Sequence, residues 1–363
     1  MRSLKILWLN WRCWVNPAMG GAEVFTHEVA KRWVACGHEV SLFTSQFPNC
    51  EKEEVIDGIN IIRSGGRFSV YQQAKKFYSK RFRAEAFDVV IDEINTVPFF
   101  ANKFVKNNER VVALIHQLAR EFWFYETPFP ISYLGYHFLE DRWLKQYSDE
   151  LTITVSESTR KDLLNLGYKN LHVVPEGLNF EPLNFFPSKN SEPIVAFAGR
   201  LNRAKRPDHA IEAFKIIKEK VPDAELWVFG DGPFKDRLKR SSGEGVTFFG
   251  NLATVERRRL LEKSWVLMVP GLREGWGLNI IEANALGLPA VAYDVPGLCD
   301  SVKNNETGLL TEPGNIEDLA CKTINILTDK VLRNHLGMNA LNYSRQFNWE
   351  KTAEEFMKLI AHD

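Results

Sequence analysis

The chain contains 363 residues, of which 45% are hydrophobic and 25% are charged, and its 46 basic and 46 acidic residues leave a formal net charge of +0. This composition is that of a globular protein, and the length suits two domains of about 150–200 residues each. The balanced charge argues against a nucleic-acid partner. The five cysteines are scattered and form no Cys-x-x-Cys pair, so we predict neither a disulfide framework nor a zinc site.

The amino-terminal stretch MRSLKILWLNW is apolar, but Asn10 and Arg12 interrupt it and no small-residue cleavage site follows. This pattern indicates a first buried strand and argues against a signal peptide. No segment of the sequence approaches the ~18 consecutive apolar residues of a membrane span. We therefore expect a cytoplasmic protein, with peripheral contact at the inner face of the membrane left open.

Short apolar segments rich in β-branched residues alternate with amphipathic segments along the chain, as in parallel sheets with crossover helices. In the first half we predict strands at Lys5–Leu9, Glu39–Phe43, Asn60–Arg63, Val89–Asp92, Val111–Ile115, Leu151–Val155 and His172–Val174. Helices are expected between them, including Ala22–Cys36 and Glu157–Leu166. Gly167 follows the second of these helices at a position typical of a helix C-cap.

Residues 176–192 show no periodicity and are rich in Pro, Asn, Ser and Glu, which is typical of a linker between domains. Further strands are predicted at Ile194–Ala198, Glu225–Phe229, Val246–Phe249, Val266–Val269 and Pro289–Tyr293. From Trp349 onward the sequence is amphipathic at helical spacing. We predict two doubly wound, Rossmann-like α/β domains, 1–178 and 179–346, with a helix at about 347–363 that packs back on the first domain.

Open parallel sheets bind ligands at the carboxyl ends of their strands, so the loops at these ends are the candidate binding loops. The first is Gly20-Gly21-Ala22-Glu23, after the first predicted strand. Paired glycines let the backbone approach an anion closely, and the start of the next helix offers free N–H groups. An ordinary glycine turn would have the same sequence. No Gly-x-Gly-x-x-Gly fingerprint of a dinucleotide site follows a strand in this chain.

A basic loop, GRLNRAKRPD at residues 199–208, directly follows the first predicted strand of the second half. Arginine can grip phosphate oxygens through two parallel hydrogen bonds, and lysine adds a compact positive charge. The position of this cluster of cations at a strand end favours phosphate binding over a merely solvated loop.

The most specific motif is REGWGLNIIEA at residues 273–283, where a predicted strand leads through a glycine-bearing loop into a helix. The glycines allow a tight turn that leaves backbone N–H groups able to meet a phosphate. Glu274 and Glu282 are eight residues apart, and a carboxylate can accept two hydrogen bonds from a sugar diol. One glutamate near the transferred sugar and one near a ribose would bind both ends of a sugar nucleotide; the alternative is two unrelated surface glutamates.

These motifs resemble the GT-B glycosyltransferases, specifically glycosyltransferase family 4, whose motif of two glutamates separated by seven residues matches Glu274 and Glu282. The resemblance extends in order over nearly the whole chain, through the loop at 20–23, the segment 199–205, the segments FGDGP at 229–233 and FG at 249–250, and ANALGLP at 283–289. It implies the GT-B fold and a hexosyl transfer from a UDP or GDP sugar with retention of anomeric configuration.

The resemblance also implies roles for individual residues. Arg200 and Lys205 would hold the donor diphosphate, and Glu274 would contact the donor sugar. Glu282 would contact the ribose, and Leu252 would lie near the base. The remaining donor-site residues would be Gly20, Gly21, Gly275, Gly277, Leu278 and Asn279. Together with Arg200, Lys205 and Glu274, His116 would form the catalytic set, because it matches a histidine near the reacting sugar in relatives. Two positions depart from the family pattern: Trp276 replaces a common Phe, and Glu176 replaces a common Asn and is assigned no role.

The acceptor is expected to be a glycan, a lipid-linked molecule or a small molecule held by the first domain. Glu23, Arg120, Trp123 and Tyr125 are candidate contacts, although the aromatic residues after His116 could equally pack beneath a long loop. The segment 71–87 has five cations and one glutamate, with aromatic residues at helical intervals. It could form a basic helix on an anionic membrane or a solvated helix on the sheet.

The implied chemistry requires stabilisation of charge on the departing diphosphate, which preorganised cations and N–H groups supply. The leaving group departs ionised, so neither a general acid nor a metal cofactor is expected, and no Asp-x-Asp motif stands at a strand end. An inverting enzyme would instead need a base near His116. The alternatives to a transferase are a sugar-nucleotide epimerase or hydrolase of the same fold and a non-catalytic two-lobed binding protein.

Overall fold

The computed structural model describes residues 2–361; residues 1 and 362–363, which the predicted domain ranges include, lie outside the described residues. The chain divides into two compact units, residues 1–177 with 347–363 and residues 178–346. The division falls within the segment predicted as a linker, and the carboxyl-terminal residues belong to the first unit.

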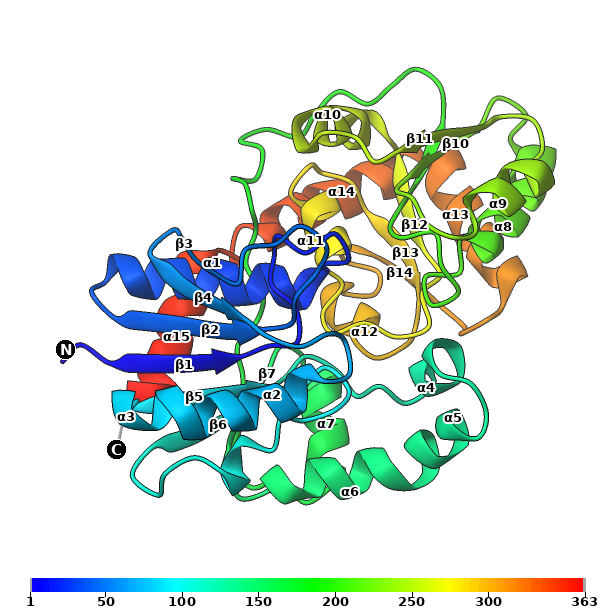
Figure 1. The fold of residues 1–363 in the computed structure, drawn as a ribbon. Helices are drawn as coiled ribbons and strands as arrows, with labels where there is room; N and C mark the ends of the chain where they lie inside the picture. The colour runs from blue at the N-terminus through cyan, green and yellow to red at the C-terminus, as the bar shows by residue number, and fades with distance from the viewer. Residues whose placement is uncertain (1, 362–363) are drawn as a thin grey trace. The chain divides into compact units, whose positions relative to one another are not determined.

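The first unit is built on an eight-stranded sheet in the order β3-β4-β2-β1-β5-β6-β7-β8 (Figure 1). The strands are β1 (Lys5–Leu9), β2 (Glu39–Thr44), β3 (Glu53–Ile56), β4 (Ile59–Arg63), β5 (Val89–Glu93), β6 (Arg110–Ile115), β7 (Leu151–Thr154) and β8 (Leu171–Val173). All neighbouring strands are parallel except β3 and β4. The strand order reverses direction at β1, so loops after β1 and β5 lie where such sheets bind ligands.

Helices of the first unit cover both faces of its sheet. They are α1 (Gly21–Ala35), α2 (Val70–Phe77), η1 (Tyr78–Phe82), α3 (Arg83–Glu85), η2 (Ala101–Lys103), α4 (Phe122–Glu126), α5 (Ile131–Leu134), η3 (Gly135–Leu139), α6 (Glu140–Leu144), η4 (Lys145–Tyr147), α7 (Glu157–Asn165) and α15 (Trp349–Ala361). Side chains of β1 alternate between the two faces: Leu7 and Leu9 join the core that includes Val70 of α2, whereas Trp8 meets Trp33 of α1.

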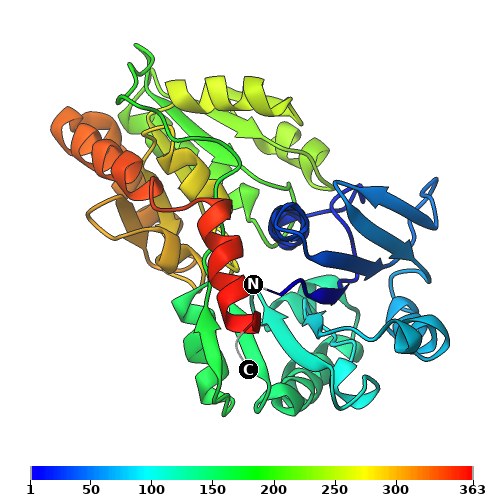
Figure 2. The ribbon, with the colours of Figure 1, turned by 90° about the vertical axis from the view of Figure 1, so that its left-hand side faces the viewer.

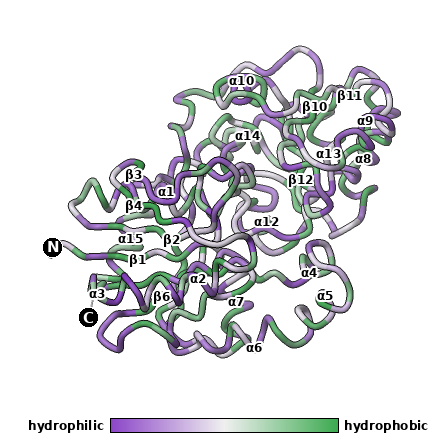
Figure 3. The backbone as a smooth tube through the Cα atoms, in the orientation of Figure 1, coloured by the Kyte–Doolittle hydropathy of each residue, from purple (hydrophilic) through white to green (hydrophobic). Residues whose placement is uncertain are grey.

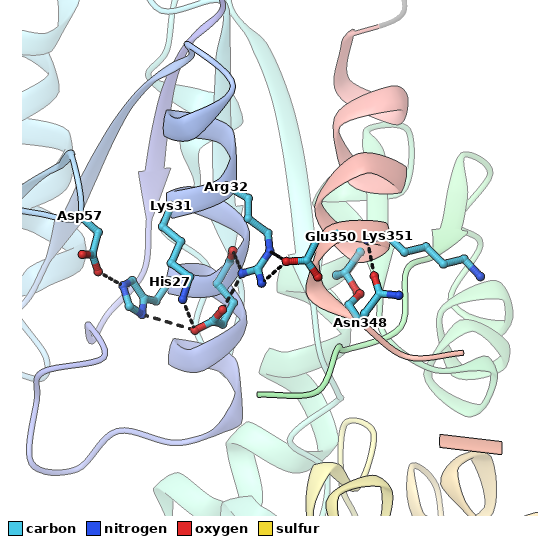
Figure 4. A network of polar contacts seen from close by, with 9 residues as sticks. His27, Lys31, Arg32, Asp57, Asn348, Glu350 and Lys351 are labelled. Carbon is cyan, nitrogen blue, oxygen red and sulfur yellow. Dashed lines mark hydrogen bonds and ion pairs between the residues drawn. The ribbon is translucent and has the colours of Figure 1, made fainter. Parts of the chain in front are cut away.

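Helix α15 packs against α1 within the first unit (Figure 2). The ring of Phe356 lies 5.8 Å from that of Trp8 and 5.0 Å from that of Trp33. The indole nitrogen of Trp33 donates a hydrogen bond of 2.9 Å to the carbonyl of Ala353. At the surface, Arg32 forms an ion pair of 2.6 Å with Glu350 (Figure 4). The last described helix therefore completes the core of the first unit.

The second unit has a parallel six-stranded sheet in the order β11-β10-β9-β12-β13-β14. Its strands are β9 (Ile194–Ala198), β10 (Glu225–Phe229), β11 (Val246–Gly250), β12 (Val266–Val269), β13 (Ala290–Tyr293) and β14 (Gly308–Thr311). Its helices are α8 (Pro207–Lys220), α9 (Lys235–Ser241), α10 (Thr254–Lys263), α11 (Leu278–Asn284), α12 (Leu298–Ser301), α13 (Ile316–Thr328) and α14 (Lys330–Ser344). The central strands are hydrophobic and buried on both faces, as a parallel sheet between helices requires (Figure 3).

All twelve predicted strands are present, and four of them match to the residue: Lys5–Leu9, Ile194–Ala198, Glu225–Phe229 and Val266–Val269. Two strands were not predicted. β3 (EEVI) is a half-exposed edge strand whose polar residues give no apolar run, and β14 (GLLT) is only four residues long. Edge strands and very short strands carry the weakest sequence signal.

The basic segment 71–87 is more irregular than one amphipathic helix, because α2 passes through the π-helical turn η1 into α3. The apolar side chains of Val70, at the start of α2, and of Ala74, Tyr78 and Phe82 are all at most 1% exposed and belong to the core. They are therefore not available to enter a membrane, so of the two alternatives for this segment the structure supports a helix packed on the sheet. Its lysines and arginines remain on the outer side.

Candidate active site

In the second unit, the basic loop after β9 is joined to the loop after β12. The backbone N–H of Leu272 donates a hydrogen bond of 2.9 Å to the carbonyl of Ala204. The ammonium of Lys205 contacts the carboxylate of Glu274, and these side chains are 23% and 18% exposed. Arg200 lies on the same loop with its side chain exposed. A cation and a carboxylate expected at a donor site thus meet at the carboxyl ends of two adjacent strands.

The loop that carries Glu274 is held in place by its neighbours. The backbone N–H of Glu274 donates a hydrogen bond of 3.0 Å to the carbonyl of Pro296. Gly297 has φ +84, and a Cβ at this position would collide with the carbonyl oxygen of Glu274. At the end of the loop Gly277 has φ +87 and is the N-cap residue that precedes α11. Within α11, Asn279 donates a 2.9 Å hydrogen bond to the carbonyl of Ala198 in β9. Glycine is needed at both turns because other residues avoid this backbone region.

Glu282 lies on α11 with 10% of its side chain exposed. Its Oε2 accepts a hydrogen bond of 3.0 Å from Arg257 of α10. Leu252, the residue expected near the base, is partly buried and lies two residues before α10 begins. The second unit thus places Glu282 and Leu252 beside α10, and both glutamates of the family motif lie against a basic side chain.

In the first unit, the glycine loop after β1 is closed by Glu23. The Oε2 of Glu23 accepts a hydrogen bond of 2.5 Å from the backbone N–H of Gly20, and its Oε1 lies 3.0 Å from Arg12. Its side chain is fully buried. Glu23 therefore caps the start of α1 and stabilises this loop, and its observed contacts give it no acceptor-facing carboxylate oxygen.

His116, which follows β6, lies between two carboxylates. Its Nε2 is 3.3 Å from Oε1 of Glu93, and its Nδ1 is 3.4 Å from Oε1 of Glu176. Burial lowers the pKa of His116, but the two carboxylates outweigh this effect and raise its pKa to about 9. Burial also raises the pKa of Glu93, against the opposing effect of His116.

Sequence reasoning did not select Glu93 and assigned Glu176 no role. The signal for Glu93 was its place at the end of β5, beside the strand that carries His116. Glu176 follows β8 at the far edge of the sheet, so its approach to His116 depends on the tertiary structure.

The aromatic segment that follows His116 is divided between core and surface. Trp123 is 5% exposed, and its indole nitrogen donates a 3.2 Å hydrogen bond to Glu140 of α6. Glu140 also accepts from the backbone of Ala119 and Arg120, while Arg120 pairs with Asp141 at 2.5 Å. Thus Trp123 packs beneath the loop. In contrast, several neighbours expose large apolar side chains: Phe124, Phe129, Ile131, Tyr133, Leu134 and Phe138.

Tyr125, the remaining acceptor-side candidate, is partly buried on α4.

Within the described part of the chain, no three His, Cys, Asp or Glu side chains form a group suited to a metal ion. Over the same residues, no helix is both long and apolar enough to cross a bilayer.

Two family models match consecutive parts of the chain. The model described as Glycosyltransferase Family 4 matches residues 19–181, and the model described as Glycosyl transferases group 1 matches residues 181–343. Together they span both units, so this chain is a member of glycosyltransferase family 4. The predicted class of enzyme, a nucleotide-sugar-dependent glycosyltransferase, is confirmed at the level of the family.

Curated relatives share the catalytic class but differ in length. The sulfoquinovosyl transferase SQD2 of Arabidopsis thaliana is 29% identical over 226 residues, covering 57% of this chain and 43% of the relative. The uncharacterized glycosyltransferase MJ1607 of Methanocaldococcus jannaschii is 24% identical over 388 residues, covering 97% of this chain and 96% of the relative. The chain thus spans less than half of the first relative and nearly all of the second.

Solved structures match along the whole chain. The sucrose-phosphate synthase of Thermosynechococcus elongatus has a TM-score of 0.80 at 22% identity, covering 99% of this chain and 98% of that structure. Anabaena HepE, solved in complex with UDP and glucose, has a TM-score of 0.70 at 16% identity and covers 99% of each chain. At these identities the likeness concerns the fold, and the predicted pair of Rossmann-like domains of the GT-B type is confirmed.

Proposed function

We propose that this protein transfers a hexosyl group from a UDP sugar to an acceptor, with retention of anomeric configuration. The observation that carries the proposal is the contact between Lys205 and Glu274, which joins the predicted phosphate loop to the predicted sugar loop. UDP is preferred to GDP as the first donor to test because HepE, which shares the fold, was solved with UDP and glucose.

In this proposal Lys205 and the exposed Arg200 bind the diphosphate and stabilise the charge that grows on it as the glycosidic bond breaks. Glu274, released from part of its contact with Lys205, accepts hydrogen bonds from hydroxyl groups of the donor sugar. Glu282 accepts hydrogen bonds from the ribose in place of Arg257. No described step needs a proton donor for the leaving diphosphate, because this group departs ionised.

The test is thermal unfolding in the presence of UDP, GDP and ADP sugars. A ligand that binds only the folded state stabilises it by about 2.7 kcal/mol at one hundred times its Kd. We expect a UDP sugar to raise the Tm of the parent and to have little effect on Lys205→Ala. Lys215→Ala is the matched control, because Lys215 is a half-exposed lysine on α8 that pairs with Glu212 of the same helix. An equal shift in all three proteins, or none in the parent, contradicts the donor assignment.

We further propose that the acceptor is lipid-linked and is met at the inner face of the membrane. The support is a set of exposed apolar side chains in residues 124–138 of the first unit. An ion pair of 3.3 Å joins Glu126 of this segment to Arg67, which precedes α2, and the neighbouring Phe68 is 79% exposed. Aromatic residues together with cations favour binding to an anionic bilayer surface.

Co-sedimentation with vesicles tests the membrane contact directly. We expect the parent to pellet with phosphatidylcholine vesicles that contain phosphatidylglycerol and to remain in solution with phosphatidylcholine alone. Phe129→Ser, at a side chain that is 82% exposed, should weaken the binding. Phe185→Ser, at an equally exposed phenylalanine of the second unit, is the matched control and should bind as the parent does. Binding that is unchanged by Phe129→Ser would overturn this surface.

A further inference from the structure

We propose that Glu176 is a positioning residue of the active site. With Glu93 it holds His116 as a doubly protonated cation, so that His116 acts as a positive charge and N–H donor and does not act as a general base. This inference rests on the proposed transferase function. It adds a role for the residue at which this chain departs from the family pattern.

The argument begins with the geometry of the ring. Both nitrogens of His116 face a carboxylate oxygen, at 3.3 Å for Glu93 and 3.4 Å for Glu176. An ionised carboxylate can only accept hydrogen bonds, whereas a neutral imidazole has one N–H and one bare lone pair. A neutral ring would therefore turn a lone pair toward one of the two carboxylates. Protonation of both nitrogens removes this repulsion and gives each carboxylate a donor.

Two hydrogen bonds hold the side chain of Glu93 in its position beside His116. The Oε2 of Glu93 accepts hydrogen bonds from the indole nitrogen of Trp8 at 2.7 Å and from the hydroxyl of Thr26 at 2.5 Å. This leaves Oε1 as the atom that faces His116. The side chain of Glu93 is fully buried, so water does not weaken its charge interaction with the ring.

Glu176 reaches His116 from a different part of the first unit. Its side chain is 5% exposed, and its Oε2 lies beside the glycine loop, 3.8 Å from the place where a Cβ of Gly21 would stand. The next residue, Gly177, packs so closely against the backbone of Trp349 in α15 that a side chain at this position would collide with it. One carboxylate thus spans the distance between the histidine and the loop expected to approach the donor.

The surrounding charges are consistent with a cation at this position. Glu23 of α1 acts on Glu93 and is itself paired with Arg12 at 3.0 Å. The remaining ring neighbour is Phe25 of α1, whose ring meets that of His116 edge to face at 5.1 Å. Three carboxylates thus surround two cations only if His116 is charged, and a neutral His116 would leave an excess of two negative charges in a buried site.

The ring nitrogens have no well-aligned hydrogen bond among the described residues. The contacts to Glu93 and Glu176 are therefore long ion pairs, which hold the ring mainly by charge. A positive charge held at this position suits a hydroxyl or phosphate oxygen of the bound donor. A neutral histidine that acted as a base would lack this charge.

Nitrogen-15 NMR of the histidine side chains tests the proposal without relying on turnover. In the intact protein His116, identified by the signal that His116→Gln removes, should show both nitrogens protonated at pH 8. In Glu176→Gln the midpoint of this titration should fall by about one pH unit or more, because an opposite charge at this range shifts a pKa by about 1–3 units. Glu176→Asp should restore part of the shift, and His27 on α1 serves as the internal reference.

Activity gives the second measurement. For Glu176→Gln we expect kcat to fall at pH 8 with little change in KM for the donor, and the alkaline limb of the kcat profile to move to lower pH. A single protonated nitrogen at pH 8 in the parent overturns the proposal, as does an unchanged titration in Glu176→Gln. If the parent transfers no sugar but its His116 titrates as described, the proposed transferase function fails while the charged histidine stands.

Discussion

The ammonium of Lys205 and the carboxylate of Glu274 form an ion pair between loops that lie 69 residues apart in the sequence. Each residue belongs to a separate family motif, and each lies at the carboxyl end of a strand of the same sheet. The pair holds both side chains in place before a donor is bound. A bound donor would accept hydrogen bonds from Lys205 through its phosphates and donate hydrogen bonds to Glu274 through its sugar hydroxyls. These hydrogen bonds would replace the ion pair between the two side chains.

Removal of the Lys205 side chain should mainly slow the chemical step and therefore lower kcat. Loss of one charged donor to a developing oxyanion typically lowers kcat by about 10²–10³-fold, and we expect this range for Lys205→Ala. Kinetics with a UDP sugar at saturating acceptor measure the change. Circular dichroism should show an intact fold, since Lys205 is a partly exposed side chain. Turnover equal to that of the parent would exclude Lys205 from the donor site.

Glu282 and Arg257 offer a test of ribose binding. Glu282→Gln removes the charge expected to accept hydrogen bonds from the ribose, and we expect the Kd of the donor to rise about tenfold, or about 1.4 kcal/mol. Arg257→Ala removes the present partner of Glu282 and should leave the Kd unchanged or lower it. Isothermal titration with UDP checks both variants. If Arg257→Ala weakened donor binding and Glu282→Gln did not, the assignment of Glu282 to the ribose would be wrong.

Gly297 packs against the backbone of Glu274, so a substitution of Gly297 should displace the Glu274 loop. Gly297→Ala adds a methyl group that collides with the carbonyl oxygen of Glu274 at a backbone with φ +84. Such strain costs about 1–3 kcal/mol, which a denaturant titration would detect, and donor binding should weaken in parallel. Gly37→Ala is a control for the backbone effect alone, because Gly37 has φ +90 with no atom near its Cβ. Donor affinity should change only for Gly297→Ala.

His116 should make the stability of the protein depend on pH. Its pKa is raised to about 9 in the folded protein, above its ordinary value of 6.5. The folded state therefore binds more protons, so this contribution is fully present below pH 6.5 and is lost as the pH rises through 9. We expect the free energy of unfolding to fall more steeply over this window in the parent than in Glu176→Gln. Equal slopes in urea titrations at several pH values would contradict the raised pKa.

Helix α15 should contribute to the stability of the first unit mainly through its apolar face. Phe356 is fully buried against Trp8 and Trp33, and Phe356→Ala should cost about 3–5 kcal/mol in the free energy of unfolding. Glu350→Gln removes the ion pair with Arg32, but Glu350 is 73% exposed and the cost should stay below about 1 kcal/mol. Urea unfolding of the two variants measures the difference. Similar costs for the two variants would contradict the predominance of the apolar face.

Much of the fold was predictable because parallel strands buried on both faces appear as apolar runs, and glycine or charged residues mark their ends. The same logic selected Lys205 and Glu274 as candidates, since each lies in the loop that follows a strand. It failed for Glu176, because nothing local shows that a residue at one edge of a sheet approaches a histidine of another strand. The buried face of α2 was left undecided for a related reason: a helix whose cations point outward has the same sequence pattern whether its apolar side meets a core or a membrane.

The return of α15 to the first unit has a consequence for how the protein is made. Trp8, Phe25 and Trp33 are synthesised early, yet Trp349 and Phe356, which cover them, emerge only after the whole second unit. The second unit is continuous in sequence and has every residue of its core available first. During translation the aromatic surface of the first unit therefore stays uncovered until α15 has been synthesised, and exposed apolar surface of this kind favours aggregation of a partly folded chain.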